Sequence, residues 1–330
     1  MLVRAPSHRL LLNLIRHCLS ISASRSRPPP ILTTKLNMST TSKPTFTLND
    51  GTSVPWLAFG TGTALYGKDA AESVKQAIET GITHLDGAQM YNNEETLAAG
   101  IKASGKPRSE LYIVTKLKPP QPGQTVKGLL QESLKKLGTD YVDLFLIHTP
   151  RPANQEGKLK EQWKAMEEVH EEGLAKSIGV SNFRVEDLQV VLDGAKIVPA
   201  VNQIELHPYV WKAAEPIVAL GKKHGIVPAS YGGLTPIVRV PGGPVDSVVE
   251  TVRSRLEKTR GASVSAGQVL TKWILHKGAF VVTTTSKASR IKEFQDVEDL
   301  PDLTTEEVKG IDEAGAELHK RVYMGKVFED

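Results

Sequence analysis

The sequence predicts a single (β/α)8 barrel, the TIM-barrel fold, with a β-hairpin at its N-terminus. From Thr45 onward, short apolar segments alternate with amphipathic ones, and eight of the apolar segments have the length and composition of strands. No stretch after residue 44 has the composition of a linker. Strand–helix units that repeat without interruption over residues 45–330 are typical of one barrel.

The elements follow in a regular order along the chain. The hairpin is expected over 45–48 and 54–58, because Asn49-Asp50-Gly51 supplies the positive φ of a tight turn. Its second arm, from Val54, is counted as the first of the eight strands. The seven later strands are expected at 82–86, 111–115, 141–147, 175–180, 200–204, 226–230 and 280–283. Helices are expected at 69–80, 94–102, 125–137, 159–172, 184–193, 211–224, 245–259, 263–277 and from Ala288.

An open doubly wound sheet is the alternative fold. It requires a glycine-rich fingerprint after its first strand, followed at once by a helix. Phe59-Gly-Thr-Gly-Thr63 is the one candidate in this sequence. It lacks the third glycine and the immediate helix, so the barrel is favoured.

The N-terminal segment differs in composition from the rest of the chain. Residues 1–49 contain seven basic residues and no acidic ones. We expect residues 1–43 to be a presequence-like or disordered extension and 44–330 to be the barrel domain. The extension resembles a mitochondrial presequence, since its apolar run Leu10–Ile15 is short for a secretory signal. Alternatively, translation starts at Met38. We expect a cytoplasmic protein, or a mitochondrial one if residues 1–37 are a true presequence.

Composition also limits the partners. The net charge of +4 comes from the extension, because beyond residue 49 there are 34 basic against 37 acidic residues. A mildly acidic body without a basic stripe argues against nucleic acid. No run approaches the roughly 18 apolar residues of a membrane helix. One cysteine, Cys18, excludes a disulfide framework and a cysteine-based metal site, and we expect no metal. We expect a monomer that acts on a small molecule.

Polar side chains follow the predicted strands at the end where a barrel carries its active site. A lone histidine or lysine at such a position is usually structural, but here each of seven strands carries a polar residue at or near its carboxyl end. A barrel glycosidase would need two acids there, and only Asp86 is present. The residues are Asp86, Lys116, His148, Ser181-Asn182, Gln203, Tyr231 and Thr284-Thr285-Ser286-Lys287.

Three of these residues suggest acid catalysis by a phenol. Tyr91 lies five residues after Asp86 and is expected at the same mouth as Lys116. A free tyrosine has a pKa of about 10 and is a poor acid at neutral pH. We expect the ammonium of Lys116, held by Asp86, to lower the pKa of Tyr91 toward neutrality. His148 can donate a hydrogen bond to a carbonyl oxygen and fix its position.

The sequence resembles the aldo-keto reductase family over essentially all of 45–330. The resemblance implies an NADPH-dependent carbonyl reductase with Tyr91 as proton donor, tuned by Lys116 and Asp86, and with His148 orienting the carbonyl. It also implies that Ser181, Asn182 and Gln203 hold the nicotinamide carboxamide while Tyr231 stacks on the ring. The matching blocks are His84-Leu-Asp-Gly-Ala-Gln-Met-Tyr91 with Asn93-Glu94, Ile113-Val-Thr-Lys116, Asp143-Leu-Phe-Leu-Ile-His148, Ile178-Gly-Val-Ser-Asn-Phe183 and Val201-Asn-Gln-Ile-Glu-Leu-His-Pro-Tyr209.

The segment Thr283–Arg290 is the candidate site for the cofactor's 2′-phosphate. Its hydroxyl-rich loop leads into a helix start, where backbone N–H groups bind anions. Lys287 and Arg290 add positive charge, with help from Ser286. The alternative is an ordinary helix start capped by Ser286. Thr284 occupies the position where the family usually carries lysine. This pattern resembles the fungal conjugated-polyketone and α-keto amide reductase branch, and it favours NADPH over NADH.

The expected substrate pocket differs from that of aldose-reductase-like members. Ala64, Lys118 and Thr149 stand where those members carry tryptophans, so we expect a roomier and more polar pocket. The branch resemblance implies vicinal dicarbonyl substrates such as α-keto amides, isatins or ketopantoyl lactone. We expect the loop 232–244 to fold over the pyrophosphate and the short tail 322–330 to add little to the pocket wall. The alternative function is an NADPH-binding regulatory barrel with little turnover.

Overall fold

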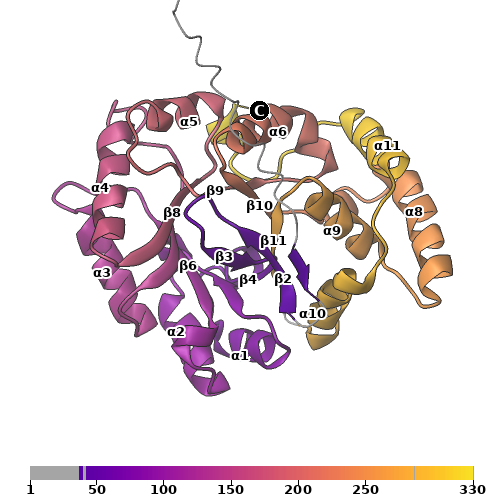
Figure 1. The fold of residues 1–330 in the computed structure, drawn as a ribbon, viewed down its shortest axis with the longest axis horizontal. Helices are drawn as coiled ribbons and strands as arrows, with labels where there is room; N and C mark the ends of the chain where they lie inside the picture. Colours follow the sequence, from indigo (N-terminus) through magenta and orange to yellow (C-terminus); the bar gives the residue numbers. More distant parts are fainter. Residues whose placement is uncertain (1–36, 40–41, 286, 330) are drawn as a thin grey trace, which may run out of the picture. The chain divides into compact units, whose positions relative to one another are not determined.

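Eight parallel strands close into a barrel in the computed structural model, which describes residues 37–39, 42–285 and 287–329 (Figure 1). Around the barrel the order is β10-β11-β4-β5-β6-β7-β8-β9, and each neighbouring pair is parallel. This confirms the predicted (β/α)8 fold. The strands are β4 (Leu57–Gly60), β5 (His84–Asp86), β6 (Tyr112–Leu117), β7 (Val142–Ile147), β8 (Ala175–Ser181), β9 (Val201–Glu205), β10 (Val227–Tyr231) and β11 (Phe280–Thr283).

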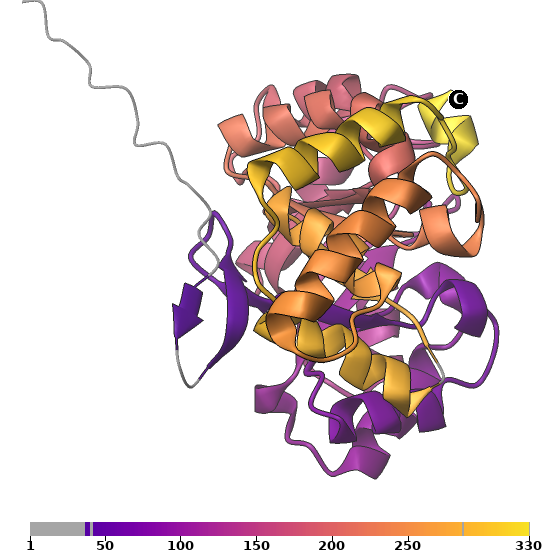
Figure 2. The same cartoon turned by 90° about the vertical axis from the view of Figure 1, so that its right-hand side faces the viewer.

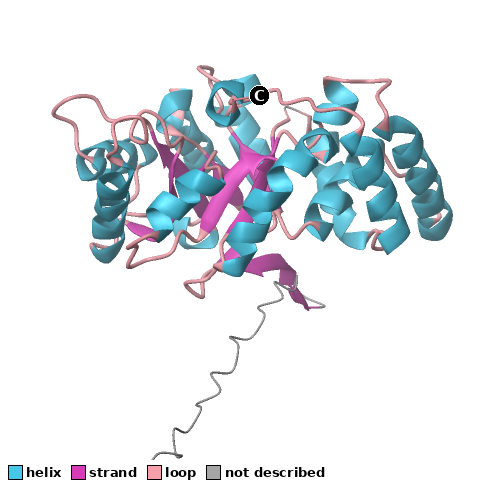
Figure 3. Ribbon diagram, turned by 90° about the horizontal axis from the view of Figure 1, so that it is seen from above, coloured by secondary structure: helices cyan, strands magenta, loops and turns pink. Residues whose placement is uncertain are grey.

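Helices surround the strands, as Figure 3 shows. Each longer helix turns an apolar stripe toward the barrel, as α3 does with Val126, Leu130 and Leu134. Within the described residues, no helix combines the length and the hydropathy needed to cross a membrane. The helices are α1 (Ala71–Glu79), α2 (Glu94–Ser104), α3 (Val126–Leu137), α4 (Leu159–Glu171), α5 (Val185–Leu192), α6 (Pro208–Lys223), α7 (Thr235–Val238), α8 (Val245–Arg260), α9 (Ala266–His276), α10 (Ala288–Gln295), α11 (Thr305–Ala316) and α12 (Gly325–Phe328).

One long helix is absent from the prediction. Helix α11 begins at a capping box, in which the Thr304 hydroxyl accepts the N–H of Glu307 and the Glu307 carboxylate accepts the N–H of Thr304. The sequence Thr-x-x-Glu is a recognised start signal. It could therefore have predicted this helix, which packs against α6 and α8.

The predicted N-terminal hairpin is confirmed as β2 (Ser42–Thr47) and β3 (Ser53–Pro55), joined by a turn with Gly51 at φ +84°. Strand β1 (Asn37–Ser39) extends this sheet by pairing with β2, so part of the segment assigned to the extension has a place in the fold. Figure 2 shows the small sheet beside the barrel, in indigo. The Phe46 ring contacts Phe280 at the start of β11, which places the hairpin over the amino ends of the strands.

The first barrel strand starts later than the prediction states. Residues 54–58 are not one strand, because the chain changes partners at Trp56. Its N–H donates to Pro44 O in the hairpin sheet, at 3.3 Å, while its carbonyl accepts the N–H of Val281 in the barrel, at 2.8 Å. The barrel strand β4 therefore begins at Leu57 and ends at Gly60.

The core of the barrel is apolar except at the carboxyl ends of the strands, where several polar side chains are buried. All six residues of β6 and of β7 are buried, as expected for strands covered on both faces. Among these apolar residues lie buried polar side chains at the carboxyl end: Asp86, Lys116, His148 and Gln203. Buried polar groups are costly unless they are hydrogen-bonded. These side chains therefore have to satisfy one another, which they do at the candidate site.

A substitution at Gly179 in β8 tests how closely β8 packs against β9. A Cβ at this position would lie 2.6 Å from Val201 O and 2.9 Å from Leu146 Cδ2. We expect Gly179→Ala to lower the free energy of unfolding by about 1–3 kcal/mol, because β8 and β9 would have to separate. Urea unfolding measures this. Gly267→Ala in α9, where the nearest atom is 3.5 Å away, is the control and should not destabilise. Wild-type stability of Gly179→Ala would contradict the packing described.

Candidate active site

Lys116 and Asp86 form a buried ion pair at the carboxyl end of the barrel. Asp86 is the last residue of β5, and Lys116 lies in the neighbouring strand β6. The Lys116 Nζ lies 2.5 Å from Asp86 Oδ1 and donates to Gly87 O at 2.9 Å. Gln203 of β9 donates its Nε2 to the other oxygen of Asp86 at 2.8 Å. The exposed fractions are 0% for Lys116 and 2% for Asp86, so the two charges depend on each other.

Tyr91 completes this cluster from a short 3-10 turn, η2 (Gln89–Tyr91). Its phenolic oxygen lies 3.4 Å from Lys116 Nζ. The His148 ring, directly after β7, meets the Tyr91 ring edge to face with centroids 5.4 Å apart. The sequence therefore correctly predicts that Asp86, Tyr91, Lys116 and His148 lie together.

A glycine that the sequence analysis did not single out makes room for this phenol. A Cβ on Gly62 would lie 2.9 Å from Tyr91 Cζ and 3.2 Å from its oxygen. The absence of a side chain at Gly62 therefore lets the Tyr91 ring take its position. Gly62 lies in the segment Phe59-Gly-Thr-Gly-Thr63, but the sequence of this segment does not show that the Tyr91 ring packs against it.

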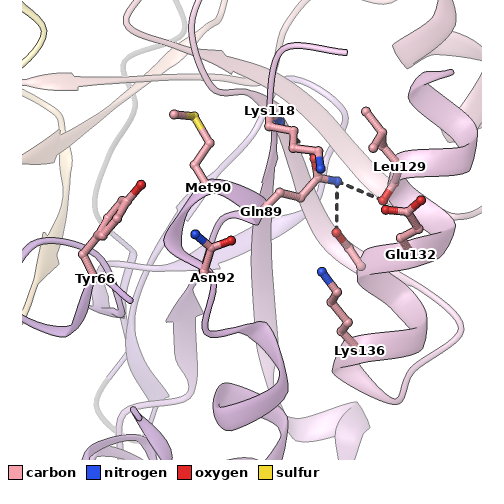
Figure 4. A pocket seen from close by; sticks show the side chains of 9 residues that line it. Tyr66, Gln89, Met90, Asn92, Lys118, Leu129, Glu132 and Lys136 are labelled. Carbon is pink, nitrogen blue, oxygen red and sulfur yellow. Dashed lines mark hydrogen bonds between the residues drawn. The ribbon is translucent and has the colours of Figure 1, made fainter. Parts of the chain in front are cut away.

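Gln89 holds the turn that carries Tyr91, and the sequence analysis missed it. Its amide nitrogen donates to Leu129 O at 2.9 Å and to Ser133 Oγ at 3.0 Å, both on α3 (Figure 4). Its amide oxygen accepts the backbone N–H of Lys118 at 2.9 Å. The buried side chain thus ties the turn to α3 and to the end of β6. Only the tertiary structure reveals these partners.

The electrostatics of the phenol differ from the prediction. Burial raises the pKa of Tyr91 well above its ordinary value, and Asp86 and Tyr66 act in the same direction. The prediction that Lys116 lowers this pKa toward neutrality is therefore wrong for the free protein. The main physical reason is that burial disfavours the charged tyrosinate, and the negative charge of Asp86 adds to this effect. Burial also lowers the pKa of Lys116, against the opposing effect of Asp86. Tyr91 is consequently a protonated phenol at neutral pH.

His148 is a neutral imidazole. Burial lowers its pKa to about 3, and the positive charge of Lys116 adds to the effect. Its Nδ1 is buried and has no hydrogen-bond partner among the described residues. A neutral imidazole can donate from one ring nitrogen only. His148 can therefore offer one N–H at the mouth of the site without carrying a charge.

The candidate nicotinamide residues form a second connected group. Asn182 donates its amide to His148 O at 2.8 Å and to Ser181 Oγ at 3.1 Å, and it accepts the hydroxyl of Tyr231 at 2.6 Å. Ser181 donates to Gln203 O at 2.8 Å. Asn182 has φ +62°, a conformation often found at functional sites. Amide and hydroxyl groups of this kind fit a carboxamide, which needs both donors and acceptors.

The candidate phosphate residues lie at the end of β11. Lys287 precedes the first residue of α10 and its N–H donates to Thr285 Oγ1 at 3.1 Å, while its side chain and that of Arg290 are exposed. Thr284 instead donates its hydroxyl to Gly60 O at 2.8 Å. Ser286 lies outside the described residues, so its predicted contact stays a prediction. The loop 232–244 contains the short helix α7, and its predicted place over the pyrophosphate also remains a prediction.

A cavity of about 280 Å³ lies beside the turn that carries Tyr91 (Figure 4). Lys118 lines it, whereas Ala64 is exposed and Thr149 is half-buried, and the expectation of a roomier and more polar substrate pocket stays a prediction. The ring of Tyr66 faces it and contacts Tyr91, with centroids 5.9 Å apart. The cavity is lined by Tyr66, Gln89, Met90, Asn92, Lys118, Leu129, Glu132, Ser133 and Lys136.

The C-terminal tail contacts Tyr231, one of the candidate nicotinamide residues. The Tyr323 ring packs against the Tyr231 ring, with centroids 5.7 Å apart and an angle of 73°. No described residue of the tail lines the cavity beside the Tyr91 turn, so the expectation that residues 322–330 add little to the pocket wall stays a prediction. A short segment can still place one aromatic ring where it covers another.

Comparison with known proteins shows the family. The model of the Aldo/keto reductase family matches residues 56–316, and the chain belongs to this family. It is 40% identical over 282 residues to the NAD/NADP-dependent indole-3-acetaldehyde reductase of Schizosaccharomyces pombe, covering 83% of this chain and 96% of that one. It is 34% identical over 299 residues to the NADPH-dependent alpha-keto amide reductase of Saccharomyces cerevisiae, covering 86% and 95%.

Solved structures agree with this assignment. The chain matches the crystal structure of a Bombyx mori aldo-keto reductase in complex with NADP, with a TM-score of 0.72 and 32% identity. The match covers 86% of this chain and 96% of that one. Both the fold and the sequence therefore place the chain among the aldo-keto reductases.

Stability measurements test the buried ion pair without reference to catalysis. Lys116→Met would leave the Asp86 carboxylate buried without its cation, so we expect a loss of about 3–5 kcal/mol in the free energy of unfolding at neutral pH. The double variant Lys116→Met/Asp86→Leu should recover most of that loss, because no unpaired charge remains. Urea unfolding of the three proteins provides the comparison. Equal losses in the single and double variants would show that the two charges do not depend on each other.

Proposed function

We propose that this protein is an NADPH-dependent carbonyl reductase that converts ketones and aldehydes to alcohols, with Tyr91 as the proton donor. The observation that supports this most is that Tyr91, Lys116 and His148 meet at one mouth beside the Ser181–Asn182–Gln203 group. These two groups place a proton donor next to side chains that fit a nicotinamide carboxamide. When bound, the cofactor supplies the hydride that the carbonyl carbon receives.

The proton step is carried by this chain's own residues. As the carbonyl carbon gains hydride, its oxygen becomes an alkoxide-like base and takes the proton of the Tyr91 phenol. The C=O double bond is thereby replaced by one C–H and one O–H bond, and a tyrosinate is left that regains a proton from water. The ammonium of Lys116, 3.4 Å away, stabilises that tyrosinate. A phenol with a raised pKa is protonated before each turnover but is a weak acid, so the proposed proton transfer depends on Lys116 stabilising the tyrosinate that forms.

His148 and Asp86 have supporting roles in the proposed mechanism. The neutral imidazole of His148 donates a hydrogen bond to the carbonyl oxygen and fixes it near the Tyr91 hydroxyl. Asp86 holds Lys116 in place through the ion pair. Ser181, Asn182 and Gln203 hold the carboxamide, and the Tyr231 ring stacks on the nicotinamide.

We propose vicinal dicarbonyl compounds, such as α-keto amides, as the substrates. Charged and amide side chains line much of the cavity next to the turn that carries Tyr91, and they would suit a polar substrate that extends into it. The similarity to an alpha-keto amide reductase agrees with this class. We further propose NADPH rather than NADH, with the 2′-phosphate held by Lys287 and Arg290 and helped by Ser286. The protein is proposed to be a monomer located in the cytoplasm, or in the mitochondrion if residues 1–37 direct it there.

Tyr91→Phe tests the proposed reaction directly. The variant lacks only the phenolic hydroxyl, which carries the proton to be donated, so we expect it to lose reduction of an α-keto amide almost completely while NADPH binds with unchanged affinity. The rate is followed as loss of NADPH absorbance, and binding as quenching of protein fluorescence. A variant that keeps more than about a tenth of the wild-type rate would show that the proton comes from elsewhere.

Lys287→Met and Arg290→Met test the phosphate site. Charge-assisted hydrogen bonds to phosphate contribute roughly 1.5–3 kcal/mol, so each variant should bind NADPH about tenfold or more weakly. NADH lacks the phosphate, and its affinity should stay the same. Fluorescence titration with both cofactors measures the difference. Equal losses for NADPH and NADH, or no loss for either, would place the phosphate elsewhere.

A further inference from the structure

Glu205 is a buried carboxylate that the proposed chemistry does not use. It is the last residue of β9, two positions after Gln203, and its exposed fraction is 0%. A carboxylate in such a place needs hydrogen-bond donors. Its donors come largely from a distant part of the chain.

The C-terminal segment supplies those donors. The backbone N–H of Val322 lies 2.9 and 3.2 Å from the two oxygens of Glu205, and the N–H of Tyr323 donates to Oε2 at 2.8 Å. His207 adds a contact from Nε2 to Oε1 at 2.9 Å, and burial lowers its pKa, so it is a neutral donor. Glu205 therefore fixes the backbone of residues 322 and 323 at the carboxyl end of β9.

Because Glu205 binds the backbone of residues 322 and 323, it helps to set the position of the Tyr323 ring. The ring packs edge to face on Tyr231, whose hydroxyl donates to Asn182 Oδ1 at 2.6 Å. Gly232 keeps the contact close, because a Cβ there would lie 3.3 Å from Tyr323 Cε2 and 3.4 Å from Glu205 Cγ. Tyr231 is thus held by Asn182 through its hydroxyl and by Tyr323 through its ring.

Glu329, near the end of the tail, forms ion pairs with two loops that border the same site. Glu329 lies 3.3 Å from Arg151 and 3.4 Å from Arg184. Arg151 follows His148 by three residues, and Arg184 follows Asn182 by two. The segment 322–329 therefore spans from the end of β9 to the loops that carry His148 and Asn182.

From these contacts we infer that Glu205 is a positioning residue, which clamps the C-terminal tail so that Tyr323 supports Tyr231 in the orientation required to stack on the nicotinamide. The inference rests on the proposed function, because it assigns Tyr231 to the cofactor. It adds a residue that touches neither cofactor nor substrate. Glutamine cannot replace Glu205, because one acceptor oxygen would become an amide that faces N–H donors.

The test compares NADPH affinity in Glu205→Gln, Tyr323→Ala and the double variant, by fluorescence titration. Aromatic pairs contribute enough for Tyr323→Ala to weaken binding by about 2- to 10-fold. We expect Glu205→Gln to weaken it by a similar factor and the double variant to be no weaker than the worse single one, since both act through one ring. Tyr323→Phe keeps the ring and should bind as the wild type does.

Glu167→Gln is a matched control for stability. Glu167 in α4 is also buried and accepts two backbone N–H groups, from Lys196 at 2.8 Å and Ile197 at 2.9 Å, and no hydrogen bond or ion pair joins it to the described residues of the tail. It should lose thermal stability as Glu205→Gln does, with unchanged NADPH affinity. Tyr323→Ala, which removes only a ring, keeps the test informative if Glu205→Gln does not fold.

The outcomes separate this inference from the proposed function. Unchanged NADPH affinity in Glu205→Gln or Tyr323→Ala, or multiplied losses in the double variant, would overturn the inference while wild-type binding stays intact. A wild-type protein that binds no NADPH would contradict the proposed function itself, and the inference with it. Equal weakening by both single variants without further loss in the double variant supports the clamp.

Discussion

The candidate active site depends on the buried ion pair between Lys116 and Asp86. Two charges in an apolar interior are costly, and they are stable only when geometry and hydrogen bonds are good. The barrel provides both, because β5 and β6 are neighbours in register and Gln203 reaches Asp86 from β9 on another part of the wall. The site is therefore built from residues that only the closed barrel brings together. The phenol of Tyr91 lies 3.4 Å from the ammonium of this pair.

Burial and the charge of Asp86 together decide the protonation state of the Tyr91 phenol. An isolated ammonium beside Tyr91 would favour tyrosinate, but burial disfavours the anion, and the negative charge of Asp86 adds to that effect. The free protein therefore keeps Tyr91 protonated, which suits a proton donor. Lys116 becomes important when the proton has left, because the tyrosinate then has an ammonium beside it. The neutral state of His148 is consistent with this, since a second positive charge would compete with Lys116.

The sequence was sufficient for the residues that follow the strands, because strand periodicity and the barrel's geometry determine where they meet. It was insufficient for residues whose roles arise only from tertiary contacts. Gln89 binds α3, Gly62 gives space to a ring 29 positions later, and Glu205 holds a segment 117 residues away. The contact between Tyr323 and Tyr231 was not predicted either, because the length of the tail does not show where Tyr323 points. Likewise, the sign of the Tyr91 pKa shift depends on burial, which no spacing reveals.

The most direct test of this account is an alkaline titration of Tyr91, followed by tyrosinate absorbance as the difference between wild type and Tyr91→Phe. If Asp86 offsets Lys116 and burial disfavours the anion, the pKa of the phenol lies above that of a free tyrosine. No tyrosinate from this position should then appear below about pH 10. An ionisation of Tyr91 near about pH 7 to 8 would contradict the account, because it would mean that the ammonium of Lys116 acts on the phenol unopposed.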